Sequence, residues 1–192
     1  MKTRSVSTFQ YTFRAPGSPV EGPIRFAMGH TALGKVIVGS TQRGICAILL
    51  GEDAQALRDQ LAAAFPAIEL QPDQASLERE LGQVIGFIDK DTSAGAVHLD
   101  IGGTAFQQKV WQALCGIPSG ETRSYSEVAR DLGTPEAVRA LAGACAANVL
   151  AIAIPCHRVV RSDGSISGYR WGVERKRTRL ADEATEAVAP AA

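Results

Sequence analysis

The sequence predicts an α+β protein in two parts: a small antiparallel sheet with flanking helices, followed by a mostly helical domain that contains a helix-turn-helix. The first part shows three short β-type runs between turn residues, and then two segments with apolar residues at helical spacing. The second part shows two capping boxes, each at the start of a helical segment. We expect a flexible lead-in over residues 1–22, an α/β domain over 23–101, a second domain over 102–184 and a disordered tail over 185–192.

Strands dominate the first domain. The lead-in is polar and carries Pro16 and Pro19, which is typical of an irregular segment. Turn residues separate the three β-type runs, and one more short strand follows the two helical patterns. In chain order we expect strands RFAMGH, GKVIVGS and GICAILLG within residues 25–51, helices near 53–65 and 76–89, and the strand VHLDI.

Helix signals dominate the second domain, which begins after Gly102-Gly103. Thr104 opens the first helix in a T-x-x-Q capping box, and that helix stops at Ile117-Pro118. Ser124 opens the next helix in an S-x-x-E box, and that helix stops at Gly133. Thr134 can then cap a third helix with Pro135 at its first position, where a missing N–H costs nothing. The last two helices form the candidate helix-turn-helix.

The third helix, PEAVRALAGACAAN, consists mostly of Ala and Gly with Arg139 as its one long cation. It offers few side chains that could read base edges in a major groove. Small residues suit a tightly packed core helix, but they also suit a shallow contact with a DNA minor groove in which Arg139 enters the base stack as a wedge. These residues leave both interpretations open.

Charge is unevenly distributed along the chain. The formal net charge is zero, which argues against a general nucleic-acid binder. Residues 101–180 nevertheless hold eleven Lys or Arg against six Asp or Glu, a balance of +5. This excess permits phosphate binding without demonstrating it. No window approaches the roughly 18 apolar residues of a membrane span, so we expect a cytoplasmic protein, or a nuclear one in a eukaryote. We also expect a monomer.

Cysteines and histidines are too scattered for a metal site. Cys46, Cys115, Cys145 and Cys156 form no C-x-x-C pair, and the chain has only three histidines. Structural zinc needs four close-set ligands, and a reduced intracellular chain has no disulfide framework. We therefore expect no metal, no disulfide and no cofactor.

Cys156 differs from the other cysteines in its surroundings. The apolar run AIAI before it reads as a short β-type or extended segment, and Pro155 excludes a helix through this point. A thiol needs positive charge or a base nearby to reach its reactive form, and His157, Arg158 and Arg161 supply candidates. Neighbours on an extended chain point to opposite faces, so His157 would act through a water or be oriented by a third residue. The pattern indicates a nucleophilic cysteine.

Three motifs resemble one family. PCHRV, with GTAFQQKVWQAL before it and GYRWGVERK after it, is similar to the O6-alkylguanine-DNA alkyltransferases, also called methylated-DNA–protein-cysteine methyltransferases. The resemblance extends from Arg25 to Glu183 and is strongest to the C-terminal half of the Ada type. The zinc-bound cysteine cluster of the N-terminal half of that type has no counterpart in these residues. The resemblance implies a ribonuclease H-like first domain. It also implies single-turnover, irreversible transfer of an alkyl group from O6-alkylguanine in double-stranded DNA to cysteine, with use of O4-alkylthymine left open.

The resemblance also implies roles for the acceptor site. Cys156 matches the alkyl acceptor, and His157 matches the histidine that takes the thiol proton through a water. Glu183 matches the carboxylate that orients this histidine, and Asn148 matches the hinge asparagine between the recognition helix and the active-site loop.

DNA-binding roles follow in the same way. Tyr125 matches the tyrosine that turns the nucleotide out of the duplex, and Arg139 matches the arginine that fills the vacated stack. Backbone groups from Pro155 to Val159 would read the guanine amine, and Ser167 to Trp171 would form the pocket wall.

The chain departs from the family pattern at three positions. Arg170 and Trp171 stand where many members have small residues, which favours methyl over bulky adducts, and Arg179 stands where leucine is usual. The alternative function is a DNA-binding regulatory or damage-sensing module in which alkylation of Cys156 is a signal or does not occur.

Overall fold

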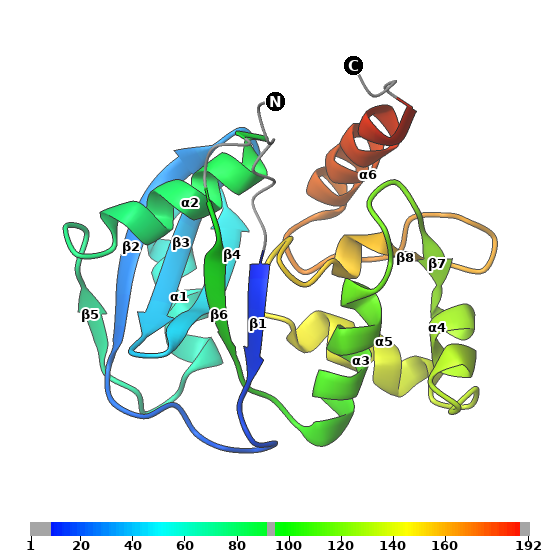
Figure 1. Ribbon diagram of the computed structural model, residues 1–192, viewed down its shortest axis with the longest axis horizontal. Helices are drawn as coiled ribbons and strands as arrows, with labels where there is room; N and C mark the ends of the chain where they lie inside the picture. The colour runs from blue at the N-terminus through cyan, green and yellow to red at the C-terminus, as the bar shows by residue number, and fades with distance from the viewer. Residues whose placement is uncertain (1–8, 92–94, 189–192) are drawn as a thin grey trace, which may run out of the picture. The chain divides into compact units, whose positions relative to one another are not determined.

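The computed structural model describes residues 9–91 and 95–188. The chain divides into two compact units, the first ending at Gly103 and the second beginning at Thr104 (Figure 1). Strands build the first unit, and helices build most of the second (Figure 1). The mixed α+β class predicted above is confirmed.

A six-stranded sheet forms the first unit within the described residues, in the order β1-β6-β4-β3-β2-β5. The hairpins β2–β3 and β3–β4 are antiparallel, but the pairings β1–β6, β4–β6 and β2–β5 are parallel. The expectation of an antiparallel sheet was therefore wrong, because β5 and β6 each return through a helical crossover rather than a hairpin. The strands are β1 Phe9–Phe13, β2 Ile24–Thr31, β3 Gly34–Thr41, β4 Gly44–Gly51, β5 Leu70–Pro72 and β6 Val97–Ile101.

Two helices cover opposite faces of this sheet. A Cβ at Gly29 would meet Leu81 and Ile85 of α2 (Glu78–Ile88), whereas one at Gly39 would meet Leu61 of α1 (Ala54–Ala64). With both faces covered, β3 and β4 are buried along almost their whole length. Their near-continuous apolar runs, VIV and ICAILL, follow from this placement.

The two ends of the chain are more ordered than expected. Residues 9–13 of the expected lead-in form β1, which adds its backbone hydrogen bonds to β6. The expected disordered tail continues as helix to Val188, in α6 (Val173–Val188). Residues 1–8 and 189–192 lie outside the described part of the chain.

The second unit packs short helices around the segment that carries Cys156. Both predicted capping boxes are formed, at Thr104 and Ser124. The predicted cap at Thr134 was wrong: residues 134–137 close a turn, with the Ala137 N–H donating to Thr134 O, and the helix begins at Val138. The elements are α3 Ala105–Cys115, β7 Arg123–Ser124, α4 Tyr125–Asp131, α5 Val138–Ala147, the 3-10 turn η1 Cys156–Arg158, β8 Val159–Val160 and α6.

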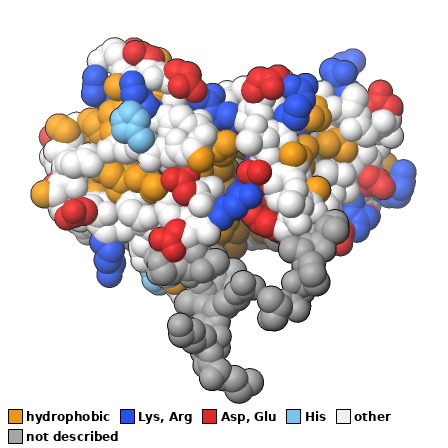
Figure 2. Space-filling view, turned by 90° about the horizontal axis from the view of Figure 1, so that it is seen from above, with side chains coloured by type: hydrophobic (Ala, Val, Ile, Leu, Met, Phe, Trp, Pro, Cys, Tyr) orange, Lys and Arg blue, Asp and Glu red, His pale blue; other side chains and the backbone are white. Residues whose placement is uncertain are grey.

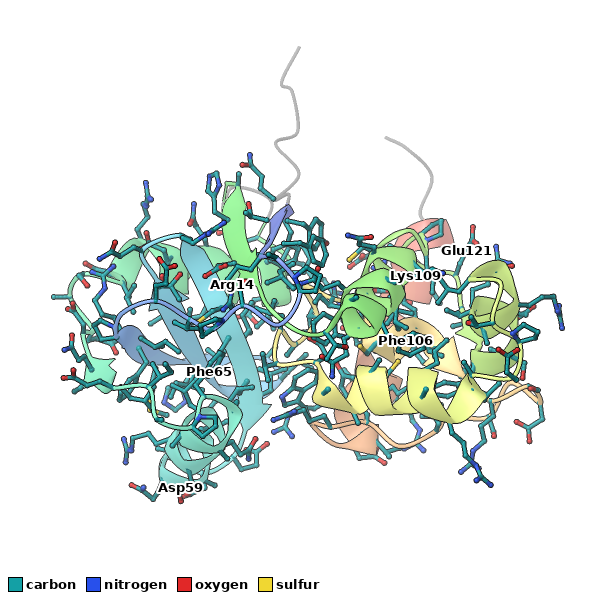
Figure 3. The ribbon with its side chains drawn as sticks, turned by 90° about the horizontal axis from the view of Figure 1, so that it is seen from below. Arg14, Asp59, Phe65, Phe106, Lys109 and Glu121 are labelled. Atoms are coloured by element: carbon teal, nitrogen blue, oxygen red, sulfur yellow. The ribbon has the colours of Figure 1, made fainter. Side chains whose placement is uncertain are left out.

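Helices α3, α4 and α5 contact one another. Figure 3 shows Phe106 and Lys109 on α3. The Lys109 ammonium donates to Leu132 O at the end of α4 with a distance of 3.1 Å, and the Trp111 indole N–H donates to Ala144 O of α5 at 2.9 Å. These two bonds attach α4 and α5 to the same supporting helix.

The segment before Cys156 is not extended, contrary to expectation. Residues 151–154 form tight turns in which the Ile154 N–H donates to Leu150 O, and Ile152 has a positive φ of 66°. A β-branched residue rarely adopts this conformation, so surrounding contacts must hold it there. All of residues 150–156 are buried.

Surface charge is mixed. Figure 2 shows Lys and Arg side chains interspersed with Asp and Glu on the face that it presents, in keeping with the zero net charge. In residues 9–91 and 95–188 we find no helix with the length and apolar character needed to cross a membrane.

Candidate functional site

A pocket of about 500 Å³ opens in the second unit between α4, α5 and the segment before α6. It brings together Tyr125, Arg139, Cys156, Ser167 and Arg170 from the residues singled out in the sequence. Val138, Ala142, Cys145, Ala146, Arg161, Gly168 and Tyr169 complete its lining.

Asn148 connects the end of α5 to the cysteine. Its fully buried carboxamide donates to Cys156 Sγ at 3.2 Å and to Ile154 O at 3.1 Å. The carboxamide oxygen accepts from the Leu150 N–H at 2.8 Å. One side chain thus holds the turn at 150–154 and the thiol in a single arrangement, which explains how Ile152 can keep its positive φ.

The Cys156 thiol is protonated at rest. Its side chain is 4 % exposed, and burial raises its pKa well above the ordinary value, with a further increase from the Cys145 thiol beside it. The hydrogen bond from Asn148 opposes this shift without overcoming it. A protonated thiol is a poor nucleophile, so reaction at this sulfur needs a base.

His157 supplies a base whose tautomer is set by a carboxylate. His157 is fully buried, and its Nε2 lies 2.8 Å from Oε1 of Glu183 on α6. Burial alone would raise the pKa of Glu183, but hydrogen bonds from His157 and Arg158 outweigh it and hold the pKa below its usual range. The ionised carboxylate can only accept, so Nε2 carries the imidazole hydrogen and Nδ1 keeps its lone pair.

Nδ1 of His157 is free to take a proton. It is buried and has no hydrogen-bond partner among the described residues. Burial lowers the pKa of His157, although the bond to Glu183 opposes the shift, so the imidazole is neutral at physiological pH. The arrangement is a buried thiol beside a neutral base that a carboxylate orients, which is the pattern of an activated nucleophile.

A hydrogen-bonded chain reaches the pocket from its buried side. The Tyr125 hydroxyl lies 2.8 Å from the Ser167 hydroxyl, which also accepts from the Lys176 ammonium at 3.0 Å. Lys176 also donates to Val159 O. The lysine is fully buried, and burial lowers its pKa to about 8. Burial raises the pKa of Tyr125, so its hydroxyl keeps its proton.

Helix α5 has one packed face and one open face. Leu141, Ala144 and Cys145 are buried, while Arg139, at the mouth of the pocket, is exposed. The open face also carries Ala142, Gly143 and Ala146, and a Cβ at Gly143 would contact nothing. The packed face agrees with the core interpretation of this alanine-rich helix, and the open face is accessible to another surface.

The pocket wall differs from expectation at two residues. Arg170 lines the pocket, and its guanidinium donates to Ala146 O in the last turn of α5 at 3.0 Å. Trp171 does not line it: the ring is buried and packs edge-on against Tyr169, with the ring centroids 5.1 Å apart. Val159 O, expected to face a base, accepts from Lys176.

Pro155 and its neighbours shape the turn itself. Pro155 O accepts from the Arg158 N–H at 3.0 Å, which closes η1, and Cys156 and His157 lie side by side in this turn rather than on an extended chain. Among the described residues, no group of three His, Cys, Asp or Glu side chains is placed to hold a metal ion.

Similar known proteins identify the family of this chain. Residues 105–185 match the family model of the 6-O-methylguanine DNA methyltransferase DNA-binding domain. The inducible methylated-DNA–protein-cysteine methyltransferase of Bacillus subtilis is 37% identical over 151 residues, which cover 79% of each chain. This chain belongs to the methylated-DNA–protein-cysteine methyltransferase family.

Two further relatives place the chain within that family. The crystal structure of Mycobacterium tuberculosis OGT in complex with DNA superposes with a TM-score of 0.70 at 31% identity, over 84% of this chain and 93% of that one. The bifunctional transcriptional activator/DNA repair enzyme Ada of Escherichia coli is 51% identical over 161 residues, 84% of this chain and 46% of Ada. The chain thus spans about half the length of Ada.

Sequence reasoning gave no role in this site to three residues. Cys145 looked like an ordinary buried residue, and Lys176 and Arg179 lay in the highly charged run VERKRTRL, which reads as a solvated helix face. The available signal was spacing: residues 176, 179 and 183 fall on one side of a helix, and the structure buries all three.

Proposed function

We propose that this protein repairs DNA by direct reversal, taking the methyl group of O6-methylguanine irreversibly onto Cys156. The observation that carries the proposal is the neutral His157, held by Glu183 with its lone-pair nitrogen unpartnered, next to a thiol that lines a pocket. The S–C bond forms as the C–O6 bond breaks. The thiol proton passes to His157 and from there to the departing guanine, which leaves as the neutral base. The thioether product has no facile leaving group, so each molecule acts once.

Proton removal is the step that the buried site must assist. In the proposed mechanism a water bridges Cys156 and Nδ1 of His157, and the Glu183 carboxylate stabilises the imidazolium that forms. The Asn148 carboxamide, 3.2 Å from Sγ, would stabilise the developing thiolate through a hydrogen bond. The contacts of Asn148 with Cys156 and of Glu183 with His157 exist before substrate arrives, so these side chains need little reorganisation during transfer.

DNA binding is assigned to α4 and α5, which we propose act as a helix-turn-helix. The open face of α5 lets backbone approach a minor groove closely, and Arg139 stands at the pocket mouth, where it could fill the gap left by an extruded base. Extrusion is required because O6 cannot reach a protein sulfur inside the stack. Tyr125, hydrogen-bonded to Ser167, would then contact the extruded guanine. We propose that one copy of the chain acts on double-stranded DNA.

For the first unit we propose a ribonuclease H-like arrangement with a supporting role. Its three antiparallel strands followed by the parallel strands β6 and β1 support this assignment.

Small adducts should be preferred. Arg170 ties the pocket wall to the end of α5, and Trp171 backs Tyr169, so both residues narrow the space beside Cys156. We expect a duplex that carries O6-methylguanine to label Cys156 faster than the same duplex with O6-benzylguanine. Equal labelling rates would contradict a narrow pocket.

Intact-mass spectrometry after incubation with O6-methylguanine duplex tests the function directly. We expect one methyl increment on the wild-type protein, none on Cys156→Ser, and an unchanged increment on the matched control Cys145→Ser, which removes the other thiol of the pocket. DNA binding without an increment would overturn transfer and favour the damage-sensing alternative.

A further inference from the structure

Arg179 lies inside the acid–base site rather than on the surface of α6. Its side chain is 8 % exposed, and its Nε is 3.3 Å from Oε1 of Glu183. The same oxygen accepts the hydrogen bond from Nε2 of His157 at 2.8 Å. Arg179 and His157 therefore share one carboxylate oxygen in a buried environment.

Two guanidinium groups face this single carboxylate. Arg158 donates to Glu183 through Nε at 2.8 Å and through Nη2 at 2.9 Å, and Arg179 adds a second positive charge. With His157 neutral, the cluster already carries one net positive charge. Protonation of His157 would place a second one beside it, at an unfavourable energy because charges interact strongly in a buried environment.

We propose that Arg179 is a positioning residue: by sharing the Glu183 oxygen, it keeps His157 neutral and so sets the lower end of the pH range over which Cys156 accepts an alkyl group. The inference rests on the transfer function proposed above. It adds that the acid limit of the reaction depends on a charge that touches neither the thiol nor the base.

The other groups near His157 do not change charge over this range. Glu183 stays ionised because hydrogen bonds from His157 and Arg158 overcome the effect of burial on its pKa. Burial raises the pKa values of Cys156 and Tyr169, so both stay protonated, and Arg158 and Arg179 are cations throughout. Burial, and then the charges of Arg158 and Arg179, lower the pKa of His157 against the pull of Glu183.

The test is the pH profile of methyl transfer in Arg179→Met, which removes the charge and keeps a side chain of similar length. We expect the acid limb to move to higher pH by about one unit, so that on this limb the rate falls up to about tenfold while the rate near pH 8 is kept. Arg179→Lys keeps the charge and should restore the wild-type profile. A purely structural role would instead lower the rate equally at every pH.

Arg177→Met is the matched control, since Arg177 is exposed on the same helix and pairs with Glu174. Its profile should equal that of the wild type. If Arg179→Met does not fold, Arg179→Gln removes the same charge with a polar side chain and takes its place in the measurement.

An NMR titration of the His157 imidazole separates this inference from the proposed function. It needs no DNA, and we expect His157 to titrate at higher pH in Arg179→Met than in the wild type. Wild-type protein that transfers methyl groups, with His157 titrating identically in both proteins, would overturn the role of Arg179. Wild-type protein that transfers nothing would overturn the function, and the titration would still decide the inference.

Discussion

Replacing Glu183 with Gln should cost the protein much of its stability. The substitution keeps the size of the side chain but removes the buried negative charge that lies 2.8 to 3.3 Å from Arg158, Arg179 and His157. Removal of one partner from a buried ion pair costs about 3–5 kcal/mol, because the remaining charge stays buried without compensation. For a chain of 192 residues each kcal/mol lowers the melting temperature by roughly 2–4 °C, so we expect a fall of about 6–20 °C.

Thermal unfolding followed by circular dichroism measures this loss. The matched control is Glu186→Gln, which makes the same chemical change at an exposed position on the same helix. A second substitution tests whether the loss comes from unpaired charge. In the Glu183→Gln background, Arg179→Met should raise the melting temperature, because it removes a buried cation that has lost its counter-ion. If Glu183→Gln melts within about 2 °C of Glu186→Gln, the reasoning from burial and charge is refuted.

Urea unfolding at different pH values tests three other side chains. Burial lowers the pKa of His157, so below about pH 6.5 the unfolded chain binds a proton that the folded chain does not. The contribution of His157 to stability is therefore full above this pH and is lost as the pH falls toward the folded pKa. The loss should be smaller in His157→Gln. Lys176, with its pKa lowered to about 8, makes stability rise by about 3 kcal/mol between pH 8 and roughly 10.4, and Lys176→Met should abolish the rise. Asn148→Ala leaves the Leu150 N–H unpaired and removes one of the two donors to Ile154 O, which keeps its bond from the Cys156 N–H. It should cost about 1–3 kcal/mol at neutral pH, whereas a cost below about 0.5 kcal/mol would contradict its bridging role.

Local signals predicted local structure well. The capping boxes at Thr104 and Ser124 depend on residues three positions apart, and the structure forms both. The hairpin strands β2, β3 and β4 likewise follow from nearby turns and apolar runs. Prediction failed where distant segments decide: β1 becomes a strand only because β6 lies beside it, and residues 151–154 turn because Asn148 holds them.

The site was predictable in part for the same reason. PCHRV is a contiguous motif, so Cys156 and His157 could be found from the residues and their resemblance. The spacing of Lys176 and Arg179 places both on the side of the helix that carries Glu183. That this side is buried depends on how α6 packs against η1, which the spacing does not report. Charged residues are rarely buried, so a charged segment is predicted to be exposed even where the fold buries some of its side chains.

Strand β1 has a practical consequence for shortened forms of the protein. It is the outermost strand beside β6, whose Val97, Leu99 and Ile101 are buried. A chain trimmed to begin at Pro23 would leave one edge of the apolar strand β6 unpaired, and such an open edge recruits strands from other molecules. Trimming that looks harmless from the polar composition of the first 22 residues would therefore favour self-association and loss of soluble protein.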